Sequence, residues 1–510
     1  MNIKIENILK KIVQILAIII LVFLTVISIY ETADMNESEF TTYFSDNIIV
    51  HIIAIIAIIA LIKLIKKRQI KISKRTICII IAIWLILIVA WVLITQLLPR
   101  ADQSTVLEIA KDLLNGKTDA FENKNYVGAY PHQTPLIFFE AITNMIFGDY
   151  NFLWLQFLNI LAILVSIFAI YKITRILFKN RQTSIGTMLS LFLFAPLSFY
   201  VTFIYGNLFG LATSMVAVWF LLKYLESKKI RYIFVSAINI ELAILFKSNY
   251  IITLIAMLCL IILYAIKEKR LKTMLSIILL IVMYFAGNFG INAITKAVTG
   301  KERSEGVPAK AFIAMGLQEG PRAPGWYNEY NINTYKSSKY DTKKADKKAT
   351  KDLKKRIKEM VNNPGYTLDF FYKKTASQWN NPTFQCFWIN EDRKFNEEFE
   401  GIFREINTDG ITNKIFFNYM NIIQTLILFG ATSYFILDFK NIKSKQLIFI
   451  IIFIGGFLFH LIWEAKGQYT FTYFVLLIPY AIRGLLKISD INLHKNQIND
   501  KMKKIKGSQE

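Results

Sequence analysis

Long uninterrupted runs of apolar residues alternate along this chain with shorter polar or basic segments. A helix needs roughly 18 to 25 apolar residues to cross about 30 Å of hydrocarbon, and many of these runs are that long. The pattern therefore predicts an all-α, polytopic membrane protein with about twelve transmembrane helices. We expect these helices near residues 12–30, 48–65, 76–98, 151–170, 183–203, 207–225, 231–247, 250–266, 273–293, 415–437, 446–463 and 469–486.

The charges of the short connecting segments predict how the chain is oriented. The first connector on the side opposite the N-terminus, residues 31–46, is acidic. Basic connectors all fall on the side of the N-terminus, at residues 63–75, 172–181, 228–231, 267–272 and 440–445. Because short basic loops stay in the cytoplasm, we expect a multi-pass cell-membrane protein with both termini cytoplasmic. No convincing cleavage site follows the first span, so we expect it to remain as an uncleaved membrane anchor.

Two outer segments are too long to be simple connectors. In the first, residues 99–150, apolar positions at 106–114 and 135–147 follow a helical period, which predicts two helices lying in the membrane interface. The second, residues 294–414, is predicted to be a small external domain with a lysine-rich helix near 343–361. The expected organisation is two N-terminal helices (1–75), a transmembrane core (76–293), the external domain (294–414), C-terminal helices (415–486) and a basic cytoplasmic tail (487–510).

Composition narrows the class of protein further. Hydrophobic residues make up 54% of the 510 residues and charged residues only 19%, which excludes a soluble enzyme and a disordered chain. Three cysteines are too few for a disulfide scaffold. The net charge of +23 belongs to the cytoplasmic connectors and to residues 336–359, which hold 11 basic and 4 acidic residues, a net of +7. We therefore expect membrane lipids, and no nucleic acid, as partners.

Candidate chemistry begins directly after the third span, at Arg100-Ala101-Asp102-Gln103. A carboxylate at this place can act as a general base, and the guanidinium beside it can bind a phosphate with two hydrogen bonds. The structural alternative is that Arg100 extends to the interface and that Asp102 or Ser104 caps the following helix.

A second outer cluster, residues 126–135, contains His132 and Gln133 just before a predicted helix, where backbone donors favour an anion. A structural turn is the equally good alternative for His132. The four histidines are scattered, so metal-ligand spacing is absent and we predict no metal site.

A third outer cluster lies in the turn between the last two spans and includes Glu464, Lys466 and Tyr469. The alternative is an aromatic belt with a surface ion pair. Lys247, followed by Ser248 and Asn249, adds a further outer polar group. Walker loops, dinucleotide glycine fingerprints and His-Glu-x-x-His zinc motifs are missing from the sequence.

In their order and placement, these clusters resemble the GT-C superfamily of polytopic glycosyltransferases, above all bacterial relatives of the protein O-mannosyltransferases and the lipid A aminoarabinose transferases. The matching elements are Arg100-Ala101-Asp102-Gln103 and the segment from Tyr130-Pro131-His132-Gln133 to Gly148. The late Glu-x-x-x-Arg-Tyr element of that family resembles Glu464-Ala465-Lys466-Gly467-Gln468-Tyr469. The resemblance covers residues 76–486 and leaves the first two spans as an addition.

The resemblance implies transfer of a sugar, with inversion, from a polyprenyl-phosphate-linked donor to an extracytoplasmic acceptor, which is a cell-envelope glycan, a lipid or a protein. Asp102 would be the catalytic base. The donor phosphate or sugar would bind to Arg100, His132, Gln133, Lys247, Glu464, Lys466 and Tyr469. Four aromatic residues of the external domain, Trp326, Tyr327, Trp379 and Trp388, are expected to stack on sugars or to close over the acceptor.

Two positions depart from the family pattern. Gln468 stands where the family usually carries Arg, so Lys466 or Lys247 would have to contact the phosphate instead. Gln103 stands where relatives often carry a second acid, which leaves a divalent cation open as a cofactor.

Two other functions are compatible with an outer-facing membrane protein. A flippase or transporter of lipid-linked saccharides should carry charges in mid-span and broken helices in pairs, whereas the charges here gather at one face. A polysaccharide polymerase or ligase should use a diphosphate-linked donor and transfer glycan to glycan.

Overall fold

The computed structural model describes residues 2–36, 38–148, 151–268, 271–394, 405–406 and 410–491. Within those ranges, ten helical segments are long and apolar enough to cross a membrane, or eleven if one bent pair counts as a span. They are built on α1 (Asn2–Tyr30), α2 (Ile48–Lys67), α3 (Lys74–Thr95), α7 (Asn151–Phe178), α10 (Asn207–Ser227), α12 (Ile251–Glu268), α13 (Leu271–Thr299), α19 (Ile411–Leu437), α20 (Ile448–Ile462) and α21 (Gly467–Phe474), the last of which continues as a span to Ile491.

The predicted class, a polytopic helical membrane protein, is confirmed, but two of the twelve predicted spans differ from the others. The span expected at 231–247 is α11 (Ile230–Phe246), a helix of only 17 residues. The span expected at 183–203 is broken into α8 (Arg181–Leu193) and α9 (Ala195–Phe199), and the chain bends there by 57°. Pro196 in the first turn of α9 explains the break, because proline disfavours helical backbone in the preceding residue and lacks an N–H group.

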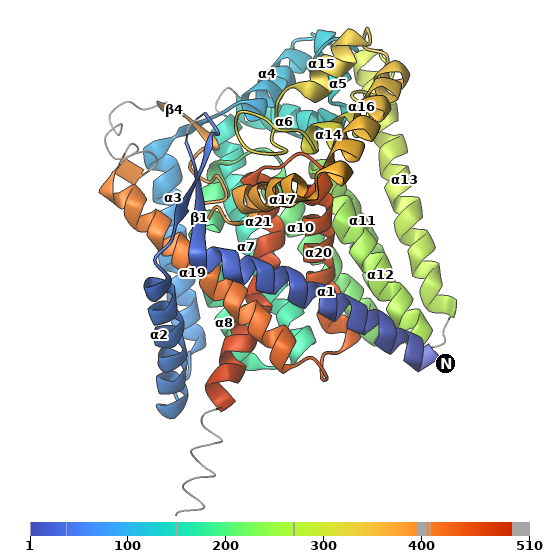
Figure 1. Cartoon of the computed structure of the whole chain (residues 1–510). Helices are drawn as coiled ribbons and strands as arrows, with labels where there is room; N and C mark the ends of the chain where they lie inside the picture. The colour runs from blue at the N-terminus through green and yellow to red at the C-terminus, as the bar shows by residue number, and fades with distance from the viewer. Residues whose placement is uncertain are drawn as a thin grey trace, which may run out of the picture.

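The first helix is part of the core. In Figure 1, α1 crosses the front of the helical body, where it packs against α19 and α12. Ala17, Leu21 and Leu24 on its inner face are fully buried. By contrast, α13 lies at the edge of the body and exposes large apolar side chains such as Phe285 and Phe289, which suits a helix that faces lipid.

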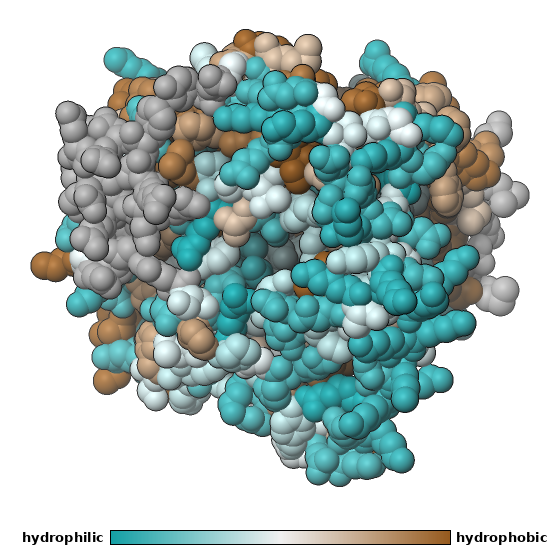
Figure 2. All heavy atoms as spheres, turned by 90° about the horizontal axis from the view of Figure 1, so that it is seen from above, coloured by the Kyte–Doolittle hydropathy of each residue, from teal (hydrophilic) through white to brown (hydrophobic). Residues whose placement is uncertain are grey.

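The long polar segments gather at one end of the helical body, the upper end in Figure 1. The strands β1 (Glu31–Met35) and β2 (Thr41–Ser45) form an antiparallel hairpin, and β3 (Leu97–Pro99) pairs with β4 (Asn390–Lys394), which joins the two long outer segments. The helices at this end are α4 (Asp102–Leu114), α5 (Tyr126–Ala129), α6 (Thr134–Phe147), α14 (Ala309–Gly316), α15 (Tyr330–Ser337), α16 (Thr342–Asn362) and α17 (Pro364–Trp379). Figure 2 views this end from above and shows a mainly hydrophilic face that is hollowed near its centre.

Both helices predicted in the first outer segment are present. On α4, the predicted apolar face is buried at Val106 and Ala110, whereas Leu114 at its end is 40% exposed. The second half of α6 exposes Met145 and Ile146, so this side of the helix is suited to lipid contact. The predicted lysine-rich helix is α16, whose first turn is capped by the Asp341 carboxylate.

The second outer segment is packed onto the transmembrane helices. The Trp379 ring lies 5.2 Å from the Phe453 ring and 5.5 Å from the Phe457 ring, measured between centroids. Trp326 is fully buried, and its indole N–H donates to Ser377 Oγ over 2.8 Å. The expectation that Trp326 and Trp379 contact sugars is therefore wrong, because both rings are used to bury apolar area in the core. Of the predicted basic tail, residues 492–510 lie outside the described part.

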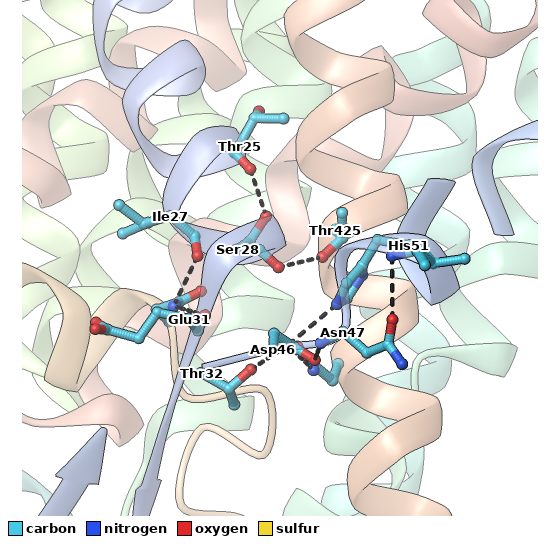
Figure 3. A network of polar contacts seen from close by, with 12 residues as sticks. Thr25, Ile27, Ser28, Glu31, Thr32, Asp46, Asn47, His51 and Thr425 are labelled. Carbon is cyan, nitrogen blue, oxygen red and sulfur yellow. Dashed lines mark hydrogen bonds and ion pairs between the residues drawn. The ribbon is translucent and has the colours of Figure 1, made fainter. Parts of the chain in front are cut away.

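A polar network joins the end of α1 and the start of α2 to the middle of α19, next to the hairpin (Figure 3). The Asp46 carboxylate accepts hydrogen bonds from the Thr32 hydroxyl and the Asn421 amide, and it lies 3.0 Å from His51 Nε2. Burial acts to raise the pKa of Asp46, but these donors outweigh it and hold the pKa below its usual value. The ionised carboxylate therefore stabilises the fold, and this contribution disappears at strongly acidic pH.

We expect Asp46→Asn to lower the free energy of unfolding by about 1 to 3 kcal/mol, because buried donors lose a charged acceptor. Thermal unfolding in detergent measures the effect. Asp369→Asn is the matched control, since the ion pair of Asp369 with Lys373 is exposed and should contribute less than about 1 kcal/mol. Equal losses in the two variants would contradict the prediction.

Candidate active site

A cavity of about 650 Å³ lies in the hollow at the polar end of the molecule. Its walls come from the β1–β2 hairpin, both long outer segments, the junction between α11 and α12 and the turn before α21. Seven of the eight residues predicted for the site line it: Asp102, His132, Gln133, Lys247, Glu464, Lys466 and Tyr469. The three outer clusters of the sequence therefore meet in one place.

Asp102 is the first residue of α4, and its side chain is exposed to the cavity. Ala101 before it has φ +54° and ψ −128°, a conformation that residues with a side chain rarely adopt. Asp102 does not cap the helix, since α4 has no side-chain cap, so the alternative structural role does not apply. Strained backbone of this kind occurs where a fold forces a functional side chain into position.

Tyr205 connects Asp102 to the second cluster. Its hydroxyl donates to Asp102 Oδ2 over 3.2 Å and accepts a hydrogen bond from Gln133 Nε2. The turn after Tyr205 requires glycine, because Gly206 has φ +78° and an added Cβ would lie 2.2 Å from Phe246 O. That close approach brings Tyr205 beside Lys247, whose Nζ lies 3.7 Å from the centre of the Tyr205 ring.

His132 lies on the cavity wall beside Gln133, and their Nε2 atoms are 3.3 Å apart. Poor solvation and the positive charges of Lys247 and Arg303 lower the pKa of His132 to about 4. The imidazole is therefore neutral near pH 7 and can accept or donate a hydrogen bond to a ligand.

Two lysines from distant parts of the chain line the cavity, and burial lowers the pKa of one of them, Lys247, to about 7. Lys247 lies on one wall, and Lys466 Nζ lies 5.0 Å from the centre of the Trp388 ring on another. Arg100 does not line the cavity, but its Cζ lies 4.7 Å from the centre of the same Trp388 ring. Such cation–aromatic contacts hold cations in partly dry surroundings, where they bind an anion strongly.

The two departures from the family pattern have a structural explanation. Gln103 is buried and turned away from Asp102: its Oε1 accepts from Ile204 N over 2.9 Å, and its Nε2 donates to Ile389 O over 2.6 Å. Gln468 does not line the cavity either, whereas Lys466 two residues earlier does. Gln103 thus holds two backbone segments, and neither glutamine lines the cavity.

Glu464 supplies a second carboxyl group to the cavity. Burial, together with the negative charges of Asp102 and Glu39, raises its pKa to about 7 against the opposing charges of Lys466 and Lys247. The turn that carries it is held by the buried Lys374, whose ammonium donates to the carbonyl oxygens of Gly316 and Trp463.

Residues 132–288 match the model of the dolichyl-phosphate-mannose-protein mannosyltransferase family. The match confirms the resemblance inferred from the sequence, over just under a third of the chain. It begins at His132 and includes Gln133, Tyr205 and Lys247 of the cavity. No curated protein matches the chain. The match supports a membrane glycosyltransferase of the GT-C type.

The described side chains around the cavity do not form a cluster of metal ligands. Within the described ranges, no group of three or more His, Cys, Asp and Glu side chains is placed to hold an ion. Gln103, at the position of the second acid in relatives, is occupied by two backbone contacts. We therefore derive no step through a metal ion.

Among the residues of the cavity wall that were not predicted for the site are Glu39, Tyr126, Tyr205 and Arg322. Tyr126 lies in the second cluster, and Tyr205 precedes the glycine turn, so their neighbourhood was visible in the sequence. Glu39 lies in the acidic connector after the first span, and Arg322 lies in a turn-rich part of the second outer segment. No local sequence pattern in either place identifies them as site residues. Of the four aromatic residues expected to contact sugars, Tyr327 and Trp388 do line the cavity.

Because the pKa of Glu464 is raised in the folded protein, its ionisation costs stability between its ordinary pKa of 4.5 and about 7. We expect Glu464→Gln to gain stability relative to wild type as the pH rises from 5 to 8, by at most roughly 3 kcal/mol. Thermal unfolding at several pH values measures this difference. Glu302→Gln, which removes an exposed carboxylate, should show no such trend. A difference that does not change with pH would contradict the assignment.

Proposed function

We propose that this protein transfers a sugar from a polyprenyl-phosphate-linked donor to an extracytoplasmic acceptor of the cell envelope. The observation that carries the proposal is the convergence of Asp102 with Lys247 and Lys466 in one cavity at the polar end of a membrane-spanning body. A volume of about 650 Å³ accommodates a sugar phosphate and the reacting end of an acceptor.

The reaction proceeds by a single displacement at the anomeric carbon. The acceptor hydroxyl attacks this carbon, Asp102 takes the hydroxyl proton, and the bond from the anomeric carbon to the phosphate oxygen breaks with inversion. Tyr205 orients the Asp102 carboxylate through its hydrogen bond. The lipid phosphate leaves with the bonding electron pair, and Lys247 and Lys466 stabilise its charge.

The remaining residues of the wall bind the donor sugar. His132, neutral near pH 7, and Gln133 offer hydrogen bonds, and Tyr469, Tyr327 and Trp388 offer aromatic surfaces. A lipid-linked donor brings its own activated leaving group. The basic connectors favour cytoplasmic termini, an orientation that would open the cavity on the extracytoplasmic face, to donors in the outer leaflet.

The purified protein, supplied with polyprenyl-monophosphate sugars and with their diphosphate counterparts, tests the donor class. We expect sugar transfer and release of polyprenyl phosphate from the monophosphate donor, only with an acceptor present, and no release of polyprenyl diphosphate from the diphosphate donor. Mass spectrometry of envelope glycans, lipids and glycoproteins from a deletion strain should show the loss of a single-sugar decoration, which identifies the acceptor. Movement of intact donor across vesicles without loss of sugar would contradict the proposal and favour a flippase.

A further inference from the structure

The hairpin between the first two helices brings a carboxylate into the cavity wall. The backbone N–H of Thr41, at the start of β2, donates to Arg322 O over 3.1 Å, and Met35, at the end of β1, packs against Trp326 and Ala465. Glu39 lies between the two strands and lines the cavity. The hairpin is therefore fixed to the outer segment and to the turn that carries Lys466.

The Glu39 carboxylate is buried, with 3% of the residue exposed, and it joins three distant segments. Its Oε1 lies 3.0 Å from Lys466 Nζ, and its Oε2 lies 3.1 Å from Arg322 Nε. Gln385 Nε2 donates to Oε1 over 3.3 Å. Glu39 also has φ +63°, in the left-handed region that residues with a side chain avoid, so the surrounding contacts hold it in a disfavoured conformation.

Each of the two cations bound by Glu39 lies against an aromatic ring of the cavity wall. Lys466 Nζ faces Trp388, and Arg322 Cζ lies 5.6 Å from the centre of the Tyr327 ring. Long basic side chains have many rotamers, and a buried ion pair with good geometry selects one of them.

We infer that Glu39 is a positioning residue of the active site, which fixes the place and the charge of Lys466, and that the two added N-terminal helices exist in part to deliver it. This inference rests on the function proposed above. It explains why α1 is buried in the core, since the hairpin that carries Glu39 starts directly at the end of that helix.

The same contact controls the protonation of Lys466. Burial alone would lower the pKa of this lysine, but the carboxylates of Glu39 and Glu464 raise it above its usual value. Loss of the Glu39 charge therefore increases the fraction of unprotonated amine, which is the form that reacts with acylating reagents.

The test compares Glu39→Gln with Glu31→Gln in the full-length protein. Glu31 lies in the same hairpin, is not among the residues that line the cavity and accepts a hydrogen bond from Tyr372 OH over 3.1 Å. Acetic anhydride at pH 8 labels lysines, and peptide mass spectrometry gives the rate at Lys466, with exposed Lys296 as the internal reference. We expect Lys466 to be labelled about tenfold faster in Glu39→Gln and at the wild-type rate in Glu31→Gln.

Sugar transfer gives the second readout. We expect kcat to fall roughly 10- to 100-fold in Glu39→Gln, because a misplaced cation stabilises the leaving phosphate poorly. In a double-mutant cycle, Glu39→Gln should cost little in a Lys466→Met background, whereas a merely structural residue would cost the same in both. Should Glu39→Gln not fold, Glu39→Asp, which keeps the charge but is too short to reach both cations, should show the same changes to a smaller extent.

Unchanged labelling of Lys466, or fully additive losses in the cycle, would overturn the inference. Faster labelling in a protein that transfers no sugar from any lipid phosphate would instead uphold the contact and refute the proposed function.

Discussion

Replacing Asp102 by asparagine should reduce sugar transfer by about 10²- to 10⁴-fold, the range that general bases contribute. Asparagine keeps the size of the side chain and can still hydrogen-bond to Tyr205, but it cannot take the proton of the acceptor hydroxyl. The loss should therefore fall on kcat, whereas the affinity for the lipid-linked donor should remain close to that of the wild type. Initial rates with purified protein, together with donor binding by calorimetry, measure both quantities.

The matched control for this variant is Glu108→Gln on the same helix. Glu108 is exposed on the face of α4 opposite the apolar one, and its nearest polar contact is Ser104 Oγ at 3.4 Å. It should transfer sugar at the wild-type rate. Full activity in Asp102→Asn would show that another group takes the proton. An equal loss in both variants would point to damage to α4.

Replacing Lys247 by methionine should lower kcat/KM by about 10²- to 10³-fold, the usual cost of removing one group that stabilises developing negative charge. Methionine keeps most of the apolar stem of lysine, so packing against Tyr205 is largely preserved. The leaving phosphate loses the cation that lies over the Tyr205 ring, beside the hydrogen-bonded side chains of Gln133, Tyr205 and Asp102. Steady-state kinetics over a range of donor concentrations give the effect on kcat and on KM separately.

Lys296→Met is the control for charge alone, because Lys296 is 65% exposed and pairs with Glu302 outside the cavity. We expect no change in its kinetics. A loss below about threefold in Lys247→Met would remove Lys247 from the phosphate site and leave that role to Lys466.

The sequence predicted more of the residues that line the cavity than of the residues that hold them in place. Asp102, Lys247 and Glu464 could be recognised as site candidates in the sequence. Charged residues at the outer ends of apolar runs are few, and all of them lie near the same membrane interface. Their meeting in a single cavity followed from the topology, which places the three outer clusters on the same side of the membrane. Arg100 was expected in the cavity, and the structure places it behind the wall, against Trp388.

Residues whose role depends on distant partners could not be found this way. Gln103 follows the proposed base Asp102 directly in the sequence. A helix turns successive residues to different sides, however, and the side-chain amide of Gln103 forms hydrogen bonds with the backbone of Ile204 and Ile389 instead. The same holds for Trp326 and Trp379, whose aromatic character fits a sugar site as well as a core. Only the packing decides between these two uses of a large ring.

The sequence by itself determined the membrane-spanning class and the grouping of polar clusters at one end. These properties follow from hydrophobic periodicity and from the cost of placing charge in lipid, both of which are local. The tertiary structure alone decided that α1 belongs to the core and that Glu39 holds Lys466 and Arg322. Those features depend on contacts between residues hundreds of positions apart, and no local pattern encodes which of the many buried side chains will meet.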